Sequence, residues 1–247
     1  ASMFGECKHA GLLWGLESLA WSTTYFSRAA QALMSLGKID KGGRFANRPM
    51  NSLGEVFLPG LPQTHASPKD RLAVFDVLVG KDHQSVWGFS KNYFNGGAIS
   101  ESHRFRWRAS GGDRRGLESE DARDYKEYME GLLPRLSSLA SLRENIVSSH
   151  ENFLHLSPSI KDRLITTLLE MAPDTFSKTE REQLLQNVRN TLNWINSYGE
   201  GKDRQYVEGL SKILTIFEPK ETLERVGWLL ETPWPTLPQG ETRSYEE

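Results

Sequence analysis

Apolar residues in the first part of the chain recur every three or four positions, which is the spacing of one face of an α-helix. The stretch HAGLLWGLESLAW (residues 9–21) follows this pattern, and TTYFSRAAQALMSL (residues 23–36) repeats it. Ser22 lies between them and is of the residue type that caps a helix N-terminus, whereas Gly37 is of the type that ends a helix. We therefore predict two antiparallel helices with a very short link, an αα-hairpin.

Serine residues in capping positions predict several later helices. Ser67 and Ser157 each precede a proline, and proline is favoured at the first position of a helix. Ser177 and Glu180 form the S-x-x-E pattern of a capping box, in which each side chain binds a free backbone N–H of the other. The helix after this box is expected to run to the Gly-Glu-Gly break at residues 199–201.

Evidence for strands is poor. Only FDVLVG (75–80) and SVWGFS (85–90) resemble strands, and both also fit two short helices broken near residues 80–82. Residues 204–217 and a helix beginning at Pro219 complete the pattern. The sequence therefore predicts an all-α fold, an irregular stack of α-hairpins or α-solenoid-like helical array with one long central loop.

The long central loop is the stretch from Asn92 to Asp121, which lacks helical periodicity. Breaks of this length are uncommon inside compact domains. We take it as the seam between two helical halves. The predicted parts are an N-terminal set of hairpins (1–100), a basic and aromatic loop (101–118) and a C-terminal helical part with a proline-rich tail (119–247).

Composition favours an ordinary globular protein. The chain has 247 residues, 38% of them hydrophobic, and a formal net charge of -2, which gives no general attraction to nucleic acid or anionic membranes. A single cysteine and the absence of a long apolar run indicate a cytoplasmic protein without a membrane span. The irregular ends of the sequence suggest a piece of a longer protein.

The common enzyme motifs are missing from the sequence. GKIDKGGR lacks the G-x-x-x-x-G-K-[ST] order of a phosphate-binding loop, and no G-x-S-x-G occurs. The two histidines of HENFLH, His150 and His155, are five residues apart, whereas ligands on one helical face need a separation of four. We interpret them as surface histidines. The expectation is a chain that is not an enzyme and has no cofactor or metal.

A basic and aromatic stretch, HRFRWRASGGDRR, leaves two interpretations open. Arginine binds phosphates and aromatic rings stack on unpaired bases, so this stretch is a candidate nucleic-acid or partner loop. Alternatively, its aromatic residues fix the loop to the core while its arginines pair with carboxylates of neighbouring helices. The candidate residues are Arg104, Arg106, Trp107, Arg108, Arg114 and Arg115.

The stretch GGRFANRPMNSLGEVFLPGLPQT (42–64) also interrupts the helices. Its glycines allow a sharp turn, and Pro49 restricts Arg48 to extended geometry. Asn51 or Ser52 is then expected to cap a short helix. Two roles stay open: bracing one hairpin against the next, or forming a pocket for an anion or a partner. The candidate signature residues are Gly42, Gly43, Arg44, Asn47, Arg48, Pro49, Asn51 and Ser52.

Most of residues 9–110 resembles a helical region of large bacterial proteins. The resemblance lies in the stretches HAGLLWGLESLAWSTTYFSRAAQALMSLGKID, GGRFANRPMNSLGEVFLPGLPQTHASPKDRLAVFDVLV and HRFRWR, and RVGWLLETPWPTLP is similar to a later part of that region. In these proteins the region accompanies a nucleotide-binding module of the STAND type (signal-transduction NTPases) or another effector, often in defence against phage. The sequence departs from the family near Gly60, where a large aromatic residue is expected.

The resemblance implies a function without catalysis in this chain. Any NTPase activity would belong to a separate upstream domain, and no catalytic residue is carried over. The expected function is a helical scaffold or a sensing region of a larger cytosolic bacterial protein, whose partner is another protein or another domain of the parent chain. A nucleic-acid-binding helical module that uses the Arg104–Arg115 stretch is the alternative.

Overall fold

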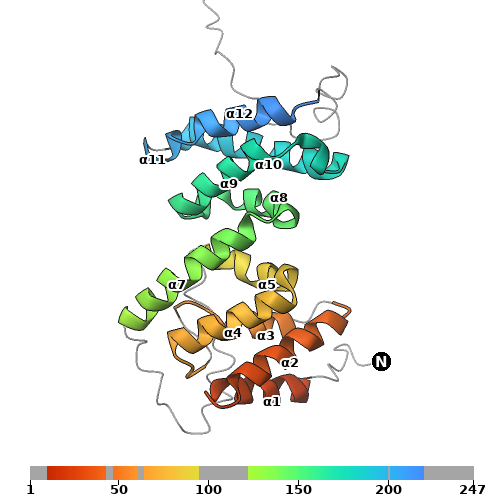
Figure 1. Ribbon diagram of the computed structural model, residues 1–247, viewed down its shortest axis with the longest axis vertical. Coiled ribbons are helices and arrows are strands. Elements are labelled where there is room, and N and C mark those ends of the chain that lie inside the picture. The colour runs from red at the N-terminus through yellow and green to blue at the C-terminus, as the bar shows by residue number, and fades with distance from the viewer. Residues whose placement is uncertain (1–9, 43–46, 61–63, 95–121, 200, 220–247) are drawn as a thin grey trace, which may run out of the picture. The chain divides into compact units, whose positions relative to one another are not determined.

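The computed structural model describes residues 10–42, 47–60, 64–94, 122–199 and 201–219 (Figure 1). All regular elements in these ranges are helices, so the predicted all-α fold is confirmed. The chain divides into two compact units, residues 1–139 and 140–247, which we call unit 1 and unit 2. The solenoid-like arrangement of the hairpins stays a prediction.

Unit 1 is built around the hairpin of its first two helices. The first helix, α1, contacts both the second and the third, and the second also contacts the fourth. In chain order the elements are α1 (Ala10–Trp21), α2 (Phe26–Ile39), α3 (Pro49–Val56), α4 (Pro68–Lys81), α5 (His83–Ser90), the 3-10 helix η1 (Lys91–Phe94) and α7 (Ala122–Ala140), which ends at the boundary between the units.

Aromatic side chains form the core of unit 1. Phe57, just after α3, lies 5.5 Å from Phe26 of α2 and 5.9 Å from Phe75 of α4, measured between ring centroids. Phe89 of α5 stacks on Phe57 at 6.0 Å. The segment between α3 and α4 is held to the end of α1, because the N–H of His65 donates to the carbonyl of Trp21 (3.1 Å).

Helix α7 belongs to unit 1 up to Leu139 and packs against the earlier elements of this unit. The Arg135 guanidinium donates to both carboxylate oxygens of Asp76 on α4, at 2.6 Å each. The Tyr128 hydroxyl donates to the carbonyl of Phe57 (3.2 Å), and the buried Arg71 guanidinium lies 3.5 Å from the Tyr128 ring centre. The structural division therefore falls inside the segment 119–247 that the sequence analysis assigned to one C-terminal part.

The predicted limits of the second helix are wrong at both ends. The Ser22 carbonyl accepts hydrogen bonds from the N–H groups of Tyr25 and Phe26 (3.1 and 2.8 Å), which forms a turn, so α2 begins only at Phe26. Gly37 lies inside α2 and does not end it. A side chain at Gly37 would overlap Met50 of α3, so this glycine permits close contact between the two helices.

The prediction that Asn51 or Ser52 caps the next helix is also wrong. Helix α3 begins earlier, with Pro49 at its first position and Arg48 as the N-cap residue. Arg48 has the extended geometry that the following proline predicts (φ -130°, ψ 149°). Asn51 and Ser52 consequently lie within the helix, where Ser52 is free to contact a neighbouring element.

Two of the three serine caps predicted for the later helices are confirmed, whereas Ser157 lies at the N-cap position of α9 without a capping hydrogen bond from its side chain. The Ser67 hydroxyl accepts the Asp70 N–H at the start of α4, and the break between the two short helices falls at Asp82, which caps α5. The Ser177–Glu180 capping box is present at the start of α10.

Unit 2 packs its helices around leucine, isoleucine and valine residues. These include the fully buried Ile160, Leu164, Leu168, Leu184, Val188, Leu210 and Ile213. Its elements are α8 (Arg143–Glu151), η3 (Phe153–His155), α9 (Pro158–Glu170), η4 (Pro173–Thr175), α10 (Lys178–Tyr198), α11 (Gly201–Arg204) and α12 (Val207–Phe217). The helix predicted from Pro219 lies outside the described residues. Among the helices described in both units, none is long and apolar enough to span a membrane.

Candidate functional site

Part of the predicted signature stretch joins helices of unit 1. Arg48 Nη1 donates to Asp40 Oδ1 (2.5 Å), which links the start of α3 to the end of α2. Gly42 has a φ of +76°, a conformation that glycine adopts without strain. Asn47 and Pro49 flank Arg48, whereas Gly43 and Arg44 lie outside the described residues.

Ser52 makes the second link of this stretch, to α1. Its hydroxyl donates to Glu17 Oε1 (2.8 Å), and both side chains are buried. Glu17 is the only charged residue in the sequence of α1. Because this carboxylate is directed into unit 1, the opposite side of α1 carries no charge.

The outward side of α1 is uncharged and largely apolar. Leu12 is 52% exposed, Trp14 46% and Leu19 44%, whereas Leu13 and Ala20 on the other side are buried. Most surface helices place charged residues on their exposed side, and a helix that is apolar all round is normally buried. The surface consists of Gly11, Leu12, Trp14, Gly15, Ser18 and Leu19, and we call it the α1 face.

The α1 face also contains one hydroxyl group, on Ser18, and two glycines, Gly11 and Gly15. The Ser18 hydroxyl donates to the carbonyl of Trp14 one turn earlier (2.8 Å), so it already has an acceptor. A Cβ atom placed on Gly11 or Gly15 would meet nothing within 4 Å. These glycines are therefore not required by the packing of unit 1.

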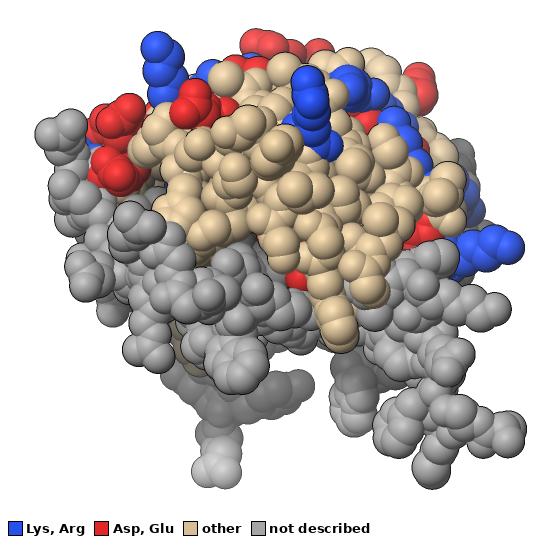
Figure 2. Space-filling view, turned by 90° about the horizontal axis from the view of Figure 1, so that it is seen from below, with Lys and Arg blue, Asp and Glu red and all other residues tan. Residues whose placement is uncertain are grey.

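Figure 2 shows the end of unit 1 that carries α1, which lies at the lower end of the ribbon in Figure 1. A broad uncharged surface lies in the upper half of this view, with Lys, Arg, Asp and Glu mainly along its top and sides and one Lys or Arg side chain projecting from it. Contiguous uncharged and apolar surfaces of this kind are typical of sites that bind proteins. The α1 face is consequently the candidate site in unit 1.

Unit 2 contains a cleft of about 240 Å³ between the end of α8, η3 and α10. Asn187 links α10 to α8 beside the cleft, because its Nδ2 donates to the Val147 carbonyl (3.2 Å). The lining contains no lysine or arginine, so it offers no cation to an anionic ligand. The lining residues are His150, Glu151, Phe153, Leu154, His155, Asn187, Asn190, Thr191 and Trp194.

The interpretation of both cleft histidines as surface residues is wrong for His150 and correct for His155. His150 is only 1% exposed and stacks on Phe153 with 5.2 Å between ring centroids. Neither ring nitrogen has a hydrogen-bond partner in the described part of the chain, and burial lowers the pKa of His150 to about 4. His150 is therefore neutral at pH 7, and both of its ring nitrogens are shielded from solvent.

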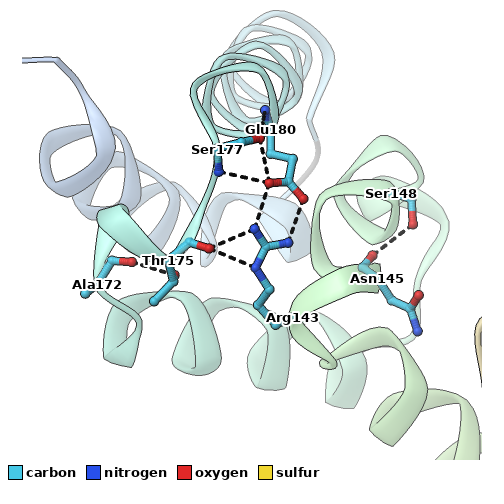
Figure 3. Close-up of polar contacts among 7 residues, drawn as sticks. All are labelled: Arg143, Asn145, Ser148, Ala172, Thr175, Ser177 and Glu180. Atoms are coloured by element: carbon cyan, nitrogen blue, oxygen red, sulfur yellow. Dashed lines mark hydrogen bonds and ion pairs between the residues drawn. The ribbon is translucent and has the colours of Figure 1, made fainter.

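A polar cluster stabilises unit 2 where α8 faces the start of α10 (Figure 3). Arg143 donates to both carboxylate oxygens of Glu180 (2.6 and 2.7 Å) and to the carbonyl of Thr175 (3.0 and 2.8 Å). Arg143 and the capping Ser177 together hold the pKa of Glu180 well below its usual range. The guanidinium of Arg143 and the carboxylate of Glu180 face each other (Figure 3), which is typical of a structural contact rather than a binding site.

The other candidate residues lie outside the described residues. These are Arg104, Arg106, Trp107, Arg108, Arg114 and Arg115 of the basic stretch, for which the nucleic-acid interpretation stays a prediction. Within the described ranges, no group of three or more His, Cys, Asp or Glu residues is arranged to hold a metal ion.

Comparisons with known proteins identified no relative of this chain. No protein-family model matches the sequence, and neither the curated proteins nor the solved structures contain a significant match. The assignment of function therefore depends on the residues of this chain.

The sequence analysis missed the α1 face, although its signal is present in the sequence. The spacing of apolar residues in 9–21 predicted a helix with one apolar face, but not that apolar residues also lie on its outward side. A twelve-residue helix with one charged residue has too few polar positions to cover an exposed side. The burial of Glu17 was the part that the pattern did not reveal, because it depends on Ser52 of α3.

Proposed function

We propose that this chain is a non-catalytic helical scaffold that binds another protein through the α1 face. The observation that supports it is the uncharged outward side of α1, on which Leu12, Trp14 and Leu19 are about half exposed. Burial of apolar surface is the dominant favourable term in most protein association. The centre of an interface is depleted of charged residues and enriched in aromatic ones, and the described residues of the α1 face include Trp14 and no charged side chain.

Because the α1 face carries no charge, covering it with a partner requires little desolvation free energy. Removing a charged group from water is costly unless it gains a partner, and the α1 face has no such group. Its one hydroxyl, on Ser18, is already bonded within the helix. A partner therefore gains the apolar area of the face without leaving a polar side chain of α1 unsatisfied.

The kind of protein to which this chain belongs is proposed from its resemblance to the helical regions of STAND-type and other antiphage proteins. On that basis we propose that the chain is a sensing or protein-interaction region of a larger cytosolic bacterial protein. The partner is another protein or another domain of the parent chain. No cofactor is part of this proposal.

The test is site-specific photocrosslinking in cells of the native host. A photoreactive benzoylphenylalanine replaces Leu19 on α1 in one variant and Val77 on α4 in the other. Val77 is a matched control, because the two side chains are 44% and 45% exposed. After irradiation, mass spectrometry identifies every peptide joined to the reactive residue.

We expect position 19 to be joined to peptides of one defined protein and position 77 to give only weak, unspecific products. A joined peptide from another protein, from a distant part of the parent chain or from a second copy supports the proposed function. The proposal is wrong if position 19 gives no more protein adducts than position 77.

A further inference from the structure

An acidic residue ends helix α8 beside the cleft of unit 2. Glu151 is the last residue of this helix and belongs to the lining of the cleft. The carbonyl end of a helix carries a partial negative charge, so a cation is favoured there and a carboxylate is not. The Oε1 of Glu151 accepts a hydrogen bond from Gln183 (2.7 Å), but no described lysine or arginine forms an ion pair with this carboxylate. A cation that entered the cleft would therefore be favoured at Glu151.

Helix α10 contributes an aromatic ring to the same cleft. Trp194 is one of the lining residues and is 42% exposed, whereas tryptophan is highly buried on average. Tyr198, one turn later, is 74% exposed, and the two ring centroids are 6.3 Å apart. The face of a tryptophan ring attracts cations more strongly than that of any other side chain. The exposed ring of Trp194 is thus a second feature of the cleft that suits a cation.

The remaining polar groups of the lining are compatible with a cation. Asn187 donates through its Nδ2 to the Val147 carbonyl, and its Oδ1 accepts no hydrogen bond from the described residues. His150 adds no positive charge at pH 7, because burial lowers its pKa to about 4. The lining therefore combines a carboxylate, an amide oxygen and an aromatic ring, and it contains no lysine or arginine.

We propose that this cleft binds the guanidinium group of an arginine side chain on a partner protein. The site is separate from the α1 face, and the inference does not depend on the function proposed for that face. A guanidinium is planar, stacks on aromatic rings and donates several hydrogen bonds, so it can use Trp194, Glu151 and Asn187 together. The ammonium of lysine is a compact point charge that cannot stack in this way.

The size and charge of the cleft favour a side chain over a free small molecule. Its volume is about 240 Å³, which is below the range of about 300–1,000 Å³ for pockets that enclose a drug-sized ligand. Free arginine also carries an α-carboxylate, and the lining offers no lysine or arginine to pair with it. An arginine within a polypeptide has no such carboxylate, so only its guanidinium needs a partner in the cleft.

The test follows the indole N–H signal of Trp194 by NMR while a ligand is added to the purified chain. Trp194→Phe assigns this signal by removing it. The first probe is the peptide acetyl-Gly-Arg-Gly-amide. The second is the same peptide with citrulline, in which a neutral urea replaces the guanidinium, and the third is free L-arginine.

Two glutamate substitutions form a matched pair. Glu151→Gln removes the charge of the cleft. Glu170→Gln removes the charge of another exposed glutamate that is the last residue of a helix, α9, and does not line the cleft. Circular dichroism checks that both variants keep their helical content.

We expect the arginine peptide to shift the Trp194 signal with a saturable dependence on concentration. The citrulline peptide should bind about fivefold more weakly or less, because hydrogen bonds from a charged donor are the stronger ones. Glu151→Gln should raise the dissociation constant of the arginine peptide by about fivefold for the same reason. Glu170→Gln should leave this constant unchanged.

The inference would be overturned by any of three results: no saturable shift with the arginine peptide, equal binding of the citrulline peptide, or equal effects of the two glutamate substitutions. Tighter binding of free L-arginine than of the arginine peptide would overturn the assignment to a partner protein. Photocrosslinking at position 19 tests only the α1 face, so the proposed function and this inference fail separately.

Discussion

His150 lies in the interior of unit 2 without a hydrogen bond to either ring nitrogen, whereas Glu17 of unit 1 is buried with a hydroxyl donor. Buried polar groups usually have partners, and one that lacks them lowers stability. Protonation makes the cost for His150 larger, because a charged imidazole needs water or an anion. Its pKa of about 4, against 6.5 for an exposed histidine, expresses this cost.

The sign of the pH effect follows from that difference. Between about pH 6.5 and 4 the unfolded chain binds more protons at this residue than the folded chain does. Stability is therefore complete above about pH 6.5 and is lost as the pH falls towards 4. The free energy of unfolding should decrease by about 2 kcal/mol between pH 7 and pH 5 through His150.

The measurement is urea unfolding, followed by circular dichroism, at pH 7 and pH 5. His150→Leu should reduce the loss of unfolding free energy between these two pH values by that amount. His155→Leu is the control, because it removes an exposed histidine from the same cleft. An unchanged pH dependence in His150→Leu would show that His150 is not buried in the neutral form.

At the scale of elements, the hydrogen bond between Ser52 of α3 and Glu17 of α1 links the inner side of α1 to α3. Ser52→Ala removes the hydroxyl that donates to the buried Glu17 carboxylate. We expect the free energy of unfolding to decrease by about 1–3 kcal/mol, the usual cost of depriving a buried group of a hydrogen bond. Denaturant unfolding of the purified variant measures this change.

The matched control is Ser18→Ala, which removes an exposed hydroxyl from the outward side of α1. Its effect should stay within about 0.5 kcal/mol, as for most surface substitutions. Equal effects of the two substitutions would mean that the Ser52–Glu17 contact does not hold α1 in place.

Local signals predicted much of the element pattern. The cap of α4 at Ser67 and the capping box of α10 were predicted because each depends on residues only a few positions apart. The start of α2 and the role of Gly37 were not predicted. Gly37 contacts Met50 of α3, and a contact of this kind leaves no local pattern in the sequence.

The candidate site was predicted only in part. Arg48 and Ser52 were singled out, and both contact other helices of unit 1, but their partners Asp40 and Glu17 were not foreseen. The spacing of two histidines describes their directions on a helix and not the depth at which the helix lies. This explains why His150 was expected at the surface.

At the scale of the whole molecule, the chain has two separately packed units, and the α1 face belongs entirely to unit 1. The cleft with His150 belongs to unit 2 and is not part of the interaction proposed for the α1 face. The central claim is therefore confined to one helix: the outward side of α1 is covered by protein when the chain is at work.

Carbene footprinting inside cells of the native host tests this claim most directly, because it measures how much of each side chain solvent reaches. Leu19 and Val77 are almost equally exposed in the free chain, at 44% and 45%. The account predicts that Leu19 is labelled several-fold less than Val77 in the cell, and equally in the unfolded chain. Equal labelling of the two residues in the cell would contradict it.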